Sequence, residues 1–193
     1  MEIELKARLL GPLLGQIEKK LDEMGAFEGE YEKADSYWLP AKGILPGFPA
    51  YGIRVRREQA LSPTADEPAR ALVTVKNKDI VDGIEANEER EFGVSDAALF
   101  EELARDMGFC MARSKVKRGR VWLVREDGLN VRAELWQVRD LGHFLELEII
   151  AEDAEAQAQE RCRKALHALL ERLGVSRECI EARPYLALLE SPS

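Results

Sequence analysis

The stretch MEIELKAR, residues 1–8, has the alternation of residue types that decides the fold of this chain. In a β-strand, successive side chains point to opposite faces of the sheet. Glu2, Glu4, Lys6 and Arg8 then share one face, about 6.5–7 Å apart, and apolar residues occupy the other. Such a polar face belongs either to an edge strand exposed to solvent or to a site that binds a metal ion and an anion.

The composition is that of one globular domain over residues 1–193, with 46% hydrophobic and 33% charged residues. No apolar run is long enough to span a bilayer, and the acidic N-terminus does not resemble a secretory signal. The net charge of −8 argues against a nucleic-acid binder. Three cysteines without metal-knuckle spacing favour a reduced, cytoplasmic protein, and two histidines leave few candidates for a zinc site or a Ser/His/Asp triad.

Hydrophobic periodicity, with Gly and Pro as breakers, predicts an α+β domain of six or more strands and three long helices. Strands are expected over residues 1–9, 28–39, 52–56, 71–76, 84–92, 130–136 and 143–150, with a hairpin joining 115–117 to 121–124 around Arg118-Gly119. Helices are expected over residues 12–24, 95–108 and 153–173, with Ser95 as the N-cap of the second. Loops are expected over residues 40–49 and 62–68, a turn over 78–83 and a short tail over 185–189.

The polar faces of these strands carry Glu, Arg and Lys almost exclusively, and the charges are sorted by strand. An ordinary half-buried sheet also alternates between apolar and polar residues, but its exposed positions favour Thr and other uncharged residues. The cationic strands carry Arg54 and Arg56, Lys76, and Lys115 and Lys117, whereas the acidic strands carry Glu2 and Glu4, Glu89 and Glu91, and Glu146 and Glu148. This sorting favours a site for a polyanion with a divalent cation, inside a barrel whose apolar faces are covered by helices.

Motifs in order along the chain resemble those of the CYTH superfamily, the triphosphate tunnel metalloenzymes, which include class IV adenylyl cyclases and thiamine and inorganic triphosphatases. The resemblance spans residues 1–189. It rests on Glu2-x-Glu4-x-Lys6, Asp35-Ser36-Tyr37, Arg54-x-Arg56, Thr74-Val75-Lys76, Glu89-x-Glu91, Gly108-Phe109, Lys115-x-Lys117, Leu141-Gly142-x-Phe144-x-Glu146-x-Glu148 and Arg183-x-Tyr185 to Leu189.

The resemblance implies an eight-stranded antiparallel barrel with a charged interior, flanking helices, and Mg²⁺ or Mn²⁺ as cofactor. It assigns the metal to Glu2, Glu4, Glu134, Glu146 and Glu148, and the phosphates to Lys6, Arg54, Arg56, Lys76, Lys115 and Lys117. Glu4, Lys76 and Glu148 are the expected catalytic residues, with Glu89 and Glu91 as supporting carboxylates. The family usually has an Asp shortly before the LGxF segment, and here Glu134 is the nearest carboxylate on that strand face, so either Glu134 substitutes or the arrangement of a second metal differs.

The expected activity is metal-dependent hydrolysis of a small-molecule triphosphate: inorganic tripolyphosphate, thiamine triphosphate or a nucleoside triphosphate. The alternatives are a class IV adenylyl cyclase, which makes cyclic AMP and pyrophosphate, and a non-catalytic module that binds polyphosphate or nucleotides. Class IV adenylyl cyclases carry a His-Phe pair before the Glu-x-Glu-x-Lys motif, whereas here Met1 directly precedes Glu2, which favours hydrolysis slightly. No nucleic-acid or membrane partner is expected, and a homodimer is one possible assembly.

Overall fold

The computed structural model describes residues 1–41, 52–61, 69–81, 83–151 and 155–190, and for residues 76–79, 81, 87 and 88 it describes the backbone alone. The expected loop over 62–68 and most of the loop over 40–49 therefore lie outside the described residues, as does Asp153 in the last long helix. None of the described helices is long and apolar enough to cross a membrane.

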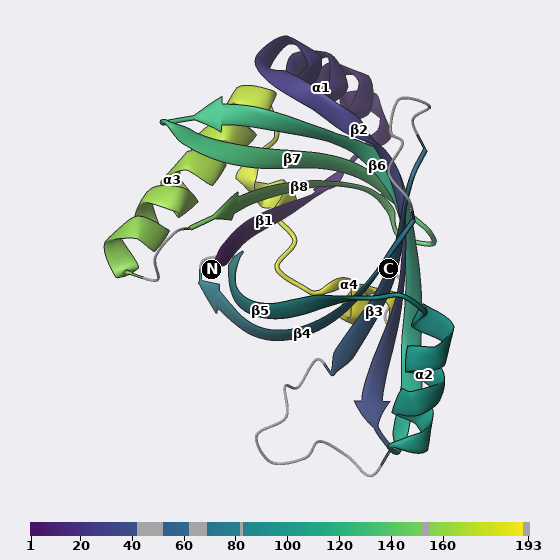
Figure 1. Ribbon diagram of the computed structural model, residues 1–193. Helices are drawn as coiled ribbons and strands as arrows, with labels where there is room; N and C mark the ends of the chain where they lie inside the picture. The colour runs from purple at the N-terminus through teal and green to yellow at the C-terminus, as the bar shows by residue number, and fades with distance from the viewer. Residues whose placement is uncertain (42–51, 62–68, 82, 152–154, 191–193) are drawn as a thin grey trace.

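In this described part of the chain, eight antiparallel strands close into a barrel (Figure 1). The strands are β1 (Glu2–Leu9), β2 (Gly25–Pro40), β3 (Ile53–Ala60), β4 (Arg70–Val81), β5 (Ile84–Val94), β6 (Phe109–Glu126), β7 (Leu129–Val138) and β8 (Gly142–Ile150). Around the barrel their order is β1-β5-β4-β3-β2-β6-β7-β8, and β8 pairs back onto β1. The α+β class and the eight-stranded antiparallel barrel are confirmed.

The main hydrophobic core lies outside the barrel, between the strands and two long helices. Helices α1 (Gly11–Met24) and α3 (Ala156–Leu173) pack over β1, β2 and β6–β8, whereas α2 (Ala97–Asp106) lies against β3 and β6 (Figure 1). The outward side chains of Ile3 and Leu5 join one fully buried cluster with Leu166 and Leu169 of α3. Burial of each such side chain contributes about 1.5–3 kcal/mol, so covering the apolar face stabilises the barrel independently of its charged interior.

The C-terminal segment returns from α3 to the barrel. It contains the short helices η1 (Arg177–Cys179) and α4 (Tyr185–Glu190). Ile180 forms an isolated antiparallel bridge with Ala7 of β1. In Figure 1 this yellow segment is visible through the barrel opening, on its way to α4.

The predicted hairpin around Arg118-Gly119 is wrong, because β6 runs through both residues without a turn. Gly119 is needed for close packing instead: a Cβ there would lie 2.0 Å from the carbonyl oxygen of Leu135 and 2.7 Å from Cε3 of Trp136. The chain reverses at Asp127 and Gly128, which have φ angles of 49° and 72°. This is the left-handed region that glycine adopts without steric cost.

Two smaller boundaries also differ from expectation. Strand β4 continues through Val81, so most of the predicted turn over 78–83 is extended chain paired with β5. The N-cap of α2 is Asp96 rather than Ser95, because the Asp96 carboxylate accepts hydrogen bonds from the backbone N–H groups of Ala98 and Leu99. Ser and Asp are both good caps, and their adjacency in the sequence left two possible starts.

Candidate active site in the barrel interior

The inward faces of all eight strands line a cavity of about 360 Å³. The register explains which charges meet. Glu85 of β5, Glu4 of β1 and Glu148 of β8 are direct cross-strand partners, and so are Lys115 of β6, Asp35 of β2 and Arg56 of β3. Cross-strand partners on one face have Cβ atoms about 4.5–5.5 Å apart, so the first row brings three acids together and the second places one acid between two cations.

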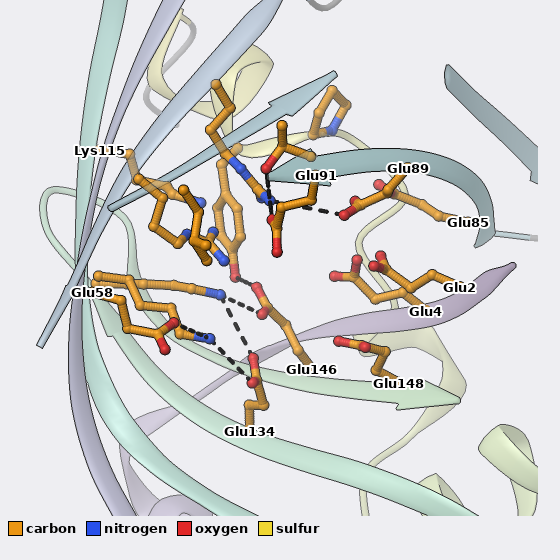
Figure 2. Close-up of a pocket in the computed structure, with 18 of the residues that line it drawn as sticks. Glu2, Glu4, Glu58, Glu85, Glu89, Glu91, Lys115, Glu134, Glu146 and Glu148 are labelled. Atoms are coloured by element: carbon orange, nitrogen blue, oxygen red, sulfur yellow. Dashed lines mark hydrogen bonds and ion pairs between the residues drawn. The ribbon is translucent and has the colours of Figure 1, made fainter. Parts of the chain in front are cut away.

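We call the inward residues Lys33, Arg56, Lys115 and Lys117, from β2, β3 and β6, the basic side of the cavity, and Glu2, Glu4, Glu85 and Glu148, from β1, β5 and β8, the acidic side. Figure 2 shows the four carboxylates of the acidic side gathered together, with Lys115 on the opposite side of the cavity. The sorting of charge by strand in the sequence thus becomes a separation of charge in space.

Asp35 neutralises part of the basic side. Its carboxylate accepts two hydrogen bonds from Arg56, at 2.7 Å from Nε and 3.0 Å from Nη2, and lies 3.1 Å from Nζ of Lys115. Burial alone would raise the pKa of Asp35, but the charges of Arg56 and Lys115 outweigh it and hold that pKa well below its usual range. Asp35 is therefore an ionised carboxylate that fixes two cations.

Glu134 and Glu146 form ion pairs with the other two cations of the basic side, Lys33 and Lys117. Glu134 accepts hydrogen bonds from Nε of Arg132 and Nε1 of Trp136, both at 2.8 Å, and Lys33 lies 3.4 Å away. Glu146 accepts from Nζ of Lys117 at 2.5 Å. Burial opposes ionisation of both carboxyls, but Lys33 beside Glu134 and Lys117 beside Glu146 keep their pKa values below the usual range.

The acidic side has the opposite electrostatics. Burial, together with the nearby carboxylates of Glu2, Glu134 and Glu4, raises the pKa of Glu148 to about 8, against a smaller opposing effect of Arg132. Like charges directly opposite on adjacent strands are destabilising. A cation bound between these carboxylates would remove that repulsion.

The donor set of the acidic side fits a hard divalent cation such as Mg²⁺ or Mn²⁺, because it consists of carboxylate oxygens alone. Among the described residues, no three Asp, Glu, His or Cys side chains already converge as a preformed metal site. The fit is therefore one of chemistry and charge, and the side chains would have to close around the ion.

Arg54 forms a separate group with residues of β4 and β5. Its Nη2 donates to Oγ1 of Thr74 at 2.9 Å and lies 3.5 Å from Glu91 and 3.9 Å from Glu89. Thr74 in turn donates to Glu91 at 2.7 Å. The Nε atom of Arg54 is buried without a hydrogen-bond partner, although the group lines the cavity. Glu89 and Glu91 thus lie where they can orient Arg54.

Comparison with known proteins agrees with this geometry. A family model of the CYTH domain matches residues 1–185. The chain belongs to the CYTH domain family. No curated protein matches this chain significantly.

Solved structures similar to this CYTH domain cover nearly all of it. The PH1012 protein of Pyrococcus horikoshii is 25% identical with a TM-score of 0.74, and the match covers 97% of this chain and 99% of that one. A candidate adenylate cyclase from Vibrio parahaemolyticus is 20% identical with a TM-score of 0.75, covering 98% of each chain. HpAC1 from Hippeastrum, a candidate adenylyl cyclase described as having a dominant triphosphatase activity, is 16% identical with a TM-score of 0.65, covering 98% of this chain and 95% of that one.

The structure brings the predicted site residues of the CYTH domain to one cavity, with one exception. The residues that line it are Glu2, Glu4, Lys6, Arg54, Arg56, Glu89, Glu91, Lys115, Lys117, Glu134, Glu146 and Glu148. The exception is Lys76, whose backbone lies in β4 but whose side chain is outside the described residues. The five expected metal carboxylates divide into two groups, because Glu134 and Glu146 bind cations of the basic side while Glu2, Glu4 and Glu148 lie on the acidic side.

Sequence reasoning did not select Lys33, Asp35, Glu85 or Tyr185 as site residues, although all four belong to the interior network. Lys33 and Asp35 are on the same face of β2, and Glu85 is on the same face of β5 as Glu89. The alternation of side chains along each strand therefore indicated that these residues share a face with site residues. Tyr185 lies outside this alternation, because it reaches the cavity from the short helix α4, and in the sequence it appeared only within the motif Arg183-x-Tyr185 to Leu189.

Proposed function

We propose that this CYTH domain hydrolyses a small-molecule triphosphate with the help of Mg²⁺ or Mn²⁺. The observation that carries the proposal is the opposition of two sides of one cavity, one rich in ordered cations and one made of carboxylates. A triphosphate with a divalent cation has the complementary charge pattern. Members of the CYTH family are enzymes, triphosphatases and cyclases, and are in general metal-dependent.

Glu2, Glu4 and Glu148 would hold the metal ion, with Glu85 directly beside Glu4. The bound ion would act as a Lewis acid, drawing charge from phosphate oxygens and favouring attack by water. The residues of the acidic side would position that ion, and Glu148 would lose its proton on binding it, because a carboxylate must be ionised to act as a ligand. Glu4 and Glu148 are catalytic in this sense.

The phosphates would lie against the basic side and Arg54. The cations of the basic side already face Asp35, Glu134 and Glu146, so they are held in place before a ligand arrives. Held cations that neutralise charge developing on transferred phosphoryl oxygens are the main source of catalysis in phosphoryl transfer. The buried, unpartnered Nε–H of Arg54 is a further donor for a phosphate oxygen.

An adenylyl cyclase remains the second candidate, since the same arrangement can bind ATP and similar structures include candidate cyclases. In that reaction the ribose 3′-hydroxyl attacks the α-phosphate and pyrophosphate leaves, whereas in hydrolysis a water attacks a phosphorus atom and releases a shorter phosphate. The two reactions differ in their products, and both need the same charged cavity.

The test is a turnover assay with tripolyphosphate, thiamine triphosphate and ATP, each with Mg²⁺, with Mn²⁺ and with EDTA. We expect metal-dependent release of phosphate from at least one of them, and EDTA should abolish it. Cyclic AMP together with pyrophosphate would establish the cyclase instead. Binding of the triphosphates without turnover under both metals would leave a non-catalytic binding module.

A further inference from the structure

The C-terminal segment is fastened to β1 beside Lys6. The backbone N–H of Glu181 donates to the carbonyl oxygen of Lys6 at 2.8 Å, and Nζ of Lys6 donates to the carbonyl oxygen of Arg183 at 2.6 Å. These contacts follow the bridge between Ala7 and Ile180. They bring Tyr185, the first residue of α4, to the wall of the cavity.

The hydroxyl of Tyr185 completes the hydrogen bonding of Glu146. It donates to Oε1 at 2.6 Å, while Nζ of Lys117 donates to Oε2 at 2.5 Å. A carboxylate held at both oxygens has little freedom to rotate, so the Lys117 ammonium is fixed with it. Burial and the Glu146 charge raise the pKa of Tyr185 well above its usual value, which keeps the phenol a donor.

The ring of Tyr185 contacts two further cations. Nζ of Lys6 lies 4.7 Å and Nζ of Lys115 lies 4.4 Å from the ring centroid. The ring also packs edge-to-face on Phe144, with centroids 5.0 Å apart, and Tyr185 is only 8% exposed. An aromatic face attracts an ammonium group without cancelling its charge, unlike a carboxylate, so it can hold cations that still attract a phosphate.

We propose that Tyr185 is a positioning residue of the anion site: its hydroxyl orients Lys117 through Glu146, and its ring holds Lys6 and Lys115 around the same point. One aromatic side chain from α4 thereby organises lysines of β1 and β6. The inference rests on the proposed function in that the anion is taken to be a triphosphate. It adds a residue that acts through the lysines and does not itself contact the substrate.

The experiment compares Tyr185→Phe, which keeps the ring, with Tyr185→Leu, which removes both ring and hydroxyl. Tripolyphosphate binding is measured by calorimetry without divalent metal, so that the result does not depend on turnover. We expect affinity to fall about 3-fold in Tyr185→Phe, from the lost hydrogen bond, and about 30-fold in Tyr185→Leu. An affinity of Tyr185→Phe between those of the wild type and Tyr185→Leu identifies the ring contacts, because both variants lack the hydroxyl and only Tyr185→Phe keeps the aromatic ring.

Leu189→Ala is the matched control, because Leu189 packs on the same cluster from the same helix and does not line the cavity. It should change the affinity less than 2-fold, whatever it does to the melting temperature. Equal affinities in wild type and both Tyr185 variants would overturn the proposal. So would a Leu189→Ala variant as weak as Tyr185→Leu, since the segment would then act by anchoring alone.

If Tyr185→Leu does not fold, as judged by circular dichroism, the comparison of Tyr185→Phe with wild type decides, and an unchanged affinity overturns the proposal. The outcome is separable from that of the proposed function. If the Tyr185 variants bind tripolyphosphate more weakly than the wild type and the wild type shows no turnover, this inference is supported and the hydrolase is refuted. If the wild type shows turnover and the Tyr185 variants bind as tightly as it does, the hydrolase is supported and this inference is refuted. A wild type that binds no tripolyphosphate overturns this inference, and the turnover assay then decides the hydrolase separately.

Discussion

Two rows of cross-strand neighbours inside the barrel show opposite solutions to burying charge. In the row Lys115–Asp35–Arg56 an acid lies between two cations, and ion pairs of 2.7 and 3.1 Å join them. In the row Glu85–Glu4–Glu148 three acids lie side by side, and burial with its acidic neighbours raises the pKa of Glu148 to about 8. In the first row the cations neutralise the acid, whereas the second row gathers negative charge that a bound cation would offset.

The difference indicates that one row of charges stabilises the barrel, whereas the other lowers its stability and is available for binding a metal ion. A buried charge that loses its partner costs several kcal/mol, so each member of the Asp35 row should be needed for folding. Neighbouring carboxylates repel one another, so the Glu4 row should cost stability that a bound metal ion recovers. Substitutions in the two rows should therefore have opposite effects on the metal-free protein.

The largest expected effect is that of Asp35→Asn. The amide removes the negative charge from between two buried cations, and we expect the free energy of unfolding to fall by about 3–5 kcal/mol. Urea denaturation measures this. Glu32→Gln, at an exposed position of the same strand, is the control and should stay within about 0.5 kcal/mol of the wild type. A loss below about 1 kcal/mol for Asp35→Asn would show that the first row does not stabilise the fold.

Glu4→Gln is the matching change in the second row. It removes the central charge between Glu85 and Glu148, so the metal-free protein should be as stable as the wild type or more stable. Metal-dependent turnover should fall by about 100-fold or more, because a metal-binding carboxylate is lost. Melting curves with and without Mg²⁺ test the first expectation and steady-state kinetics the second. Unchanged turnover would exclude Glu4 from the site.

Much of this arrangement follows from the sequence, because alternation with period two assigns each strand residue to a face. In this way alternation puts Glu4 and Lys6 on one face of β1, and the resemblance to the CYTH motifs implies that this face lines a closed barrel. Gly119 was misread, since glycine marks a turn as readily as it marks the close approach of a ring such as Trp136.

The pairing of charges within the site could not be predicted to the same extent. Alternation says that Glu146 and Glu148 point inward, but only the register shows that Glu146 lies opposite Lys6 while Glu148 lies opposite Glu4. The contact of Tyr185 with Glu146 depends on the path of the C-terminal segment along β1, and no local pattern encodes that path.

The raised pKa of Glu148 predicts a pH dependence of stability. Between about pH 4.5, the ordinary value, and about pH 8, the folded protein holds a proton that the unfolded chain has lost. The free energy of unfolding of the metal-free protein should therefore decrease as pH rises through this window. Glu148→Gln should remove this decrease, which is at most about 5 kcal/mol, at about 1.4 kcal/mol for each pH unit of the window. Urea denaturation at several pH values measures the difference, and parallel curves for the two proteins would contradict it.

The smallest effect is expected at Arg54, which tests whether the anion reaches beyond the basic side. Arg54→Ala removes a cavity-lining guanidinium with one buried, unpartnered N–H, and we expect the KM for a triphosphate to rise about 10-fold with little change in stability. Arg57→Ala is the control, because Arg57 lies on the outer face of the same strand and binds Glu101 of α2 at 2.8 and 3.0 Å. It should lower stability slightly and leave KM unchanged. Equal KM values in the two variants would place the phosphates against the lysines alone and leave Arg54 as a structural partner of Thr74 and Glu91.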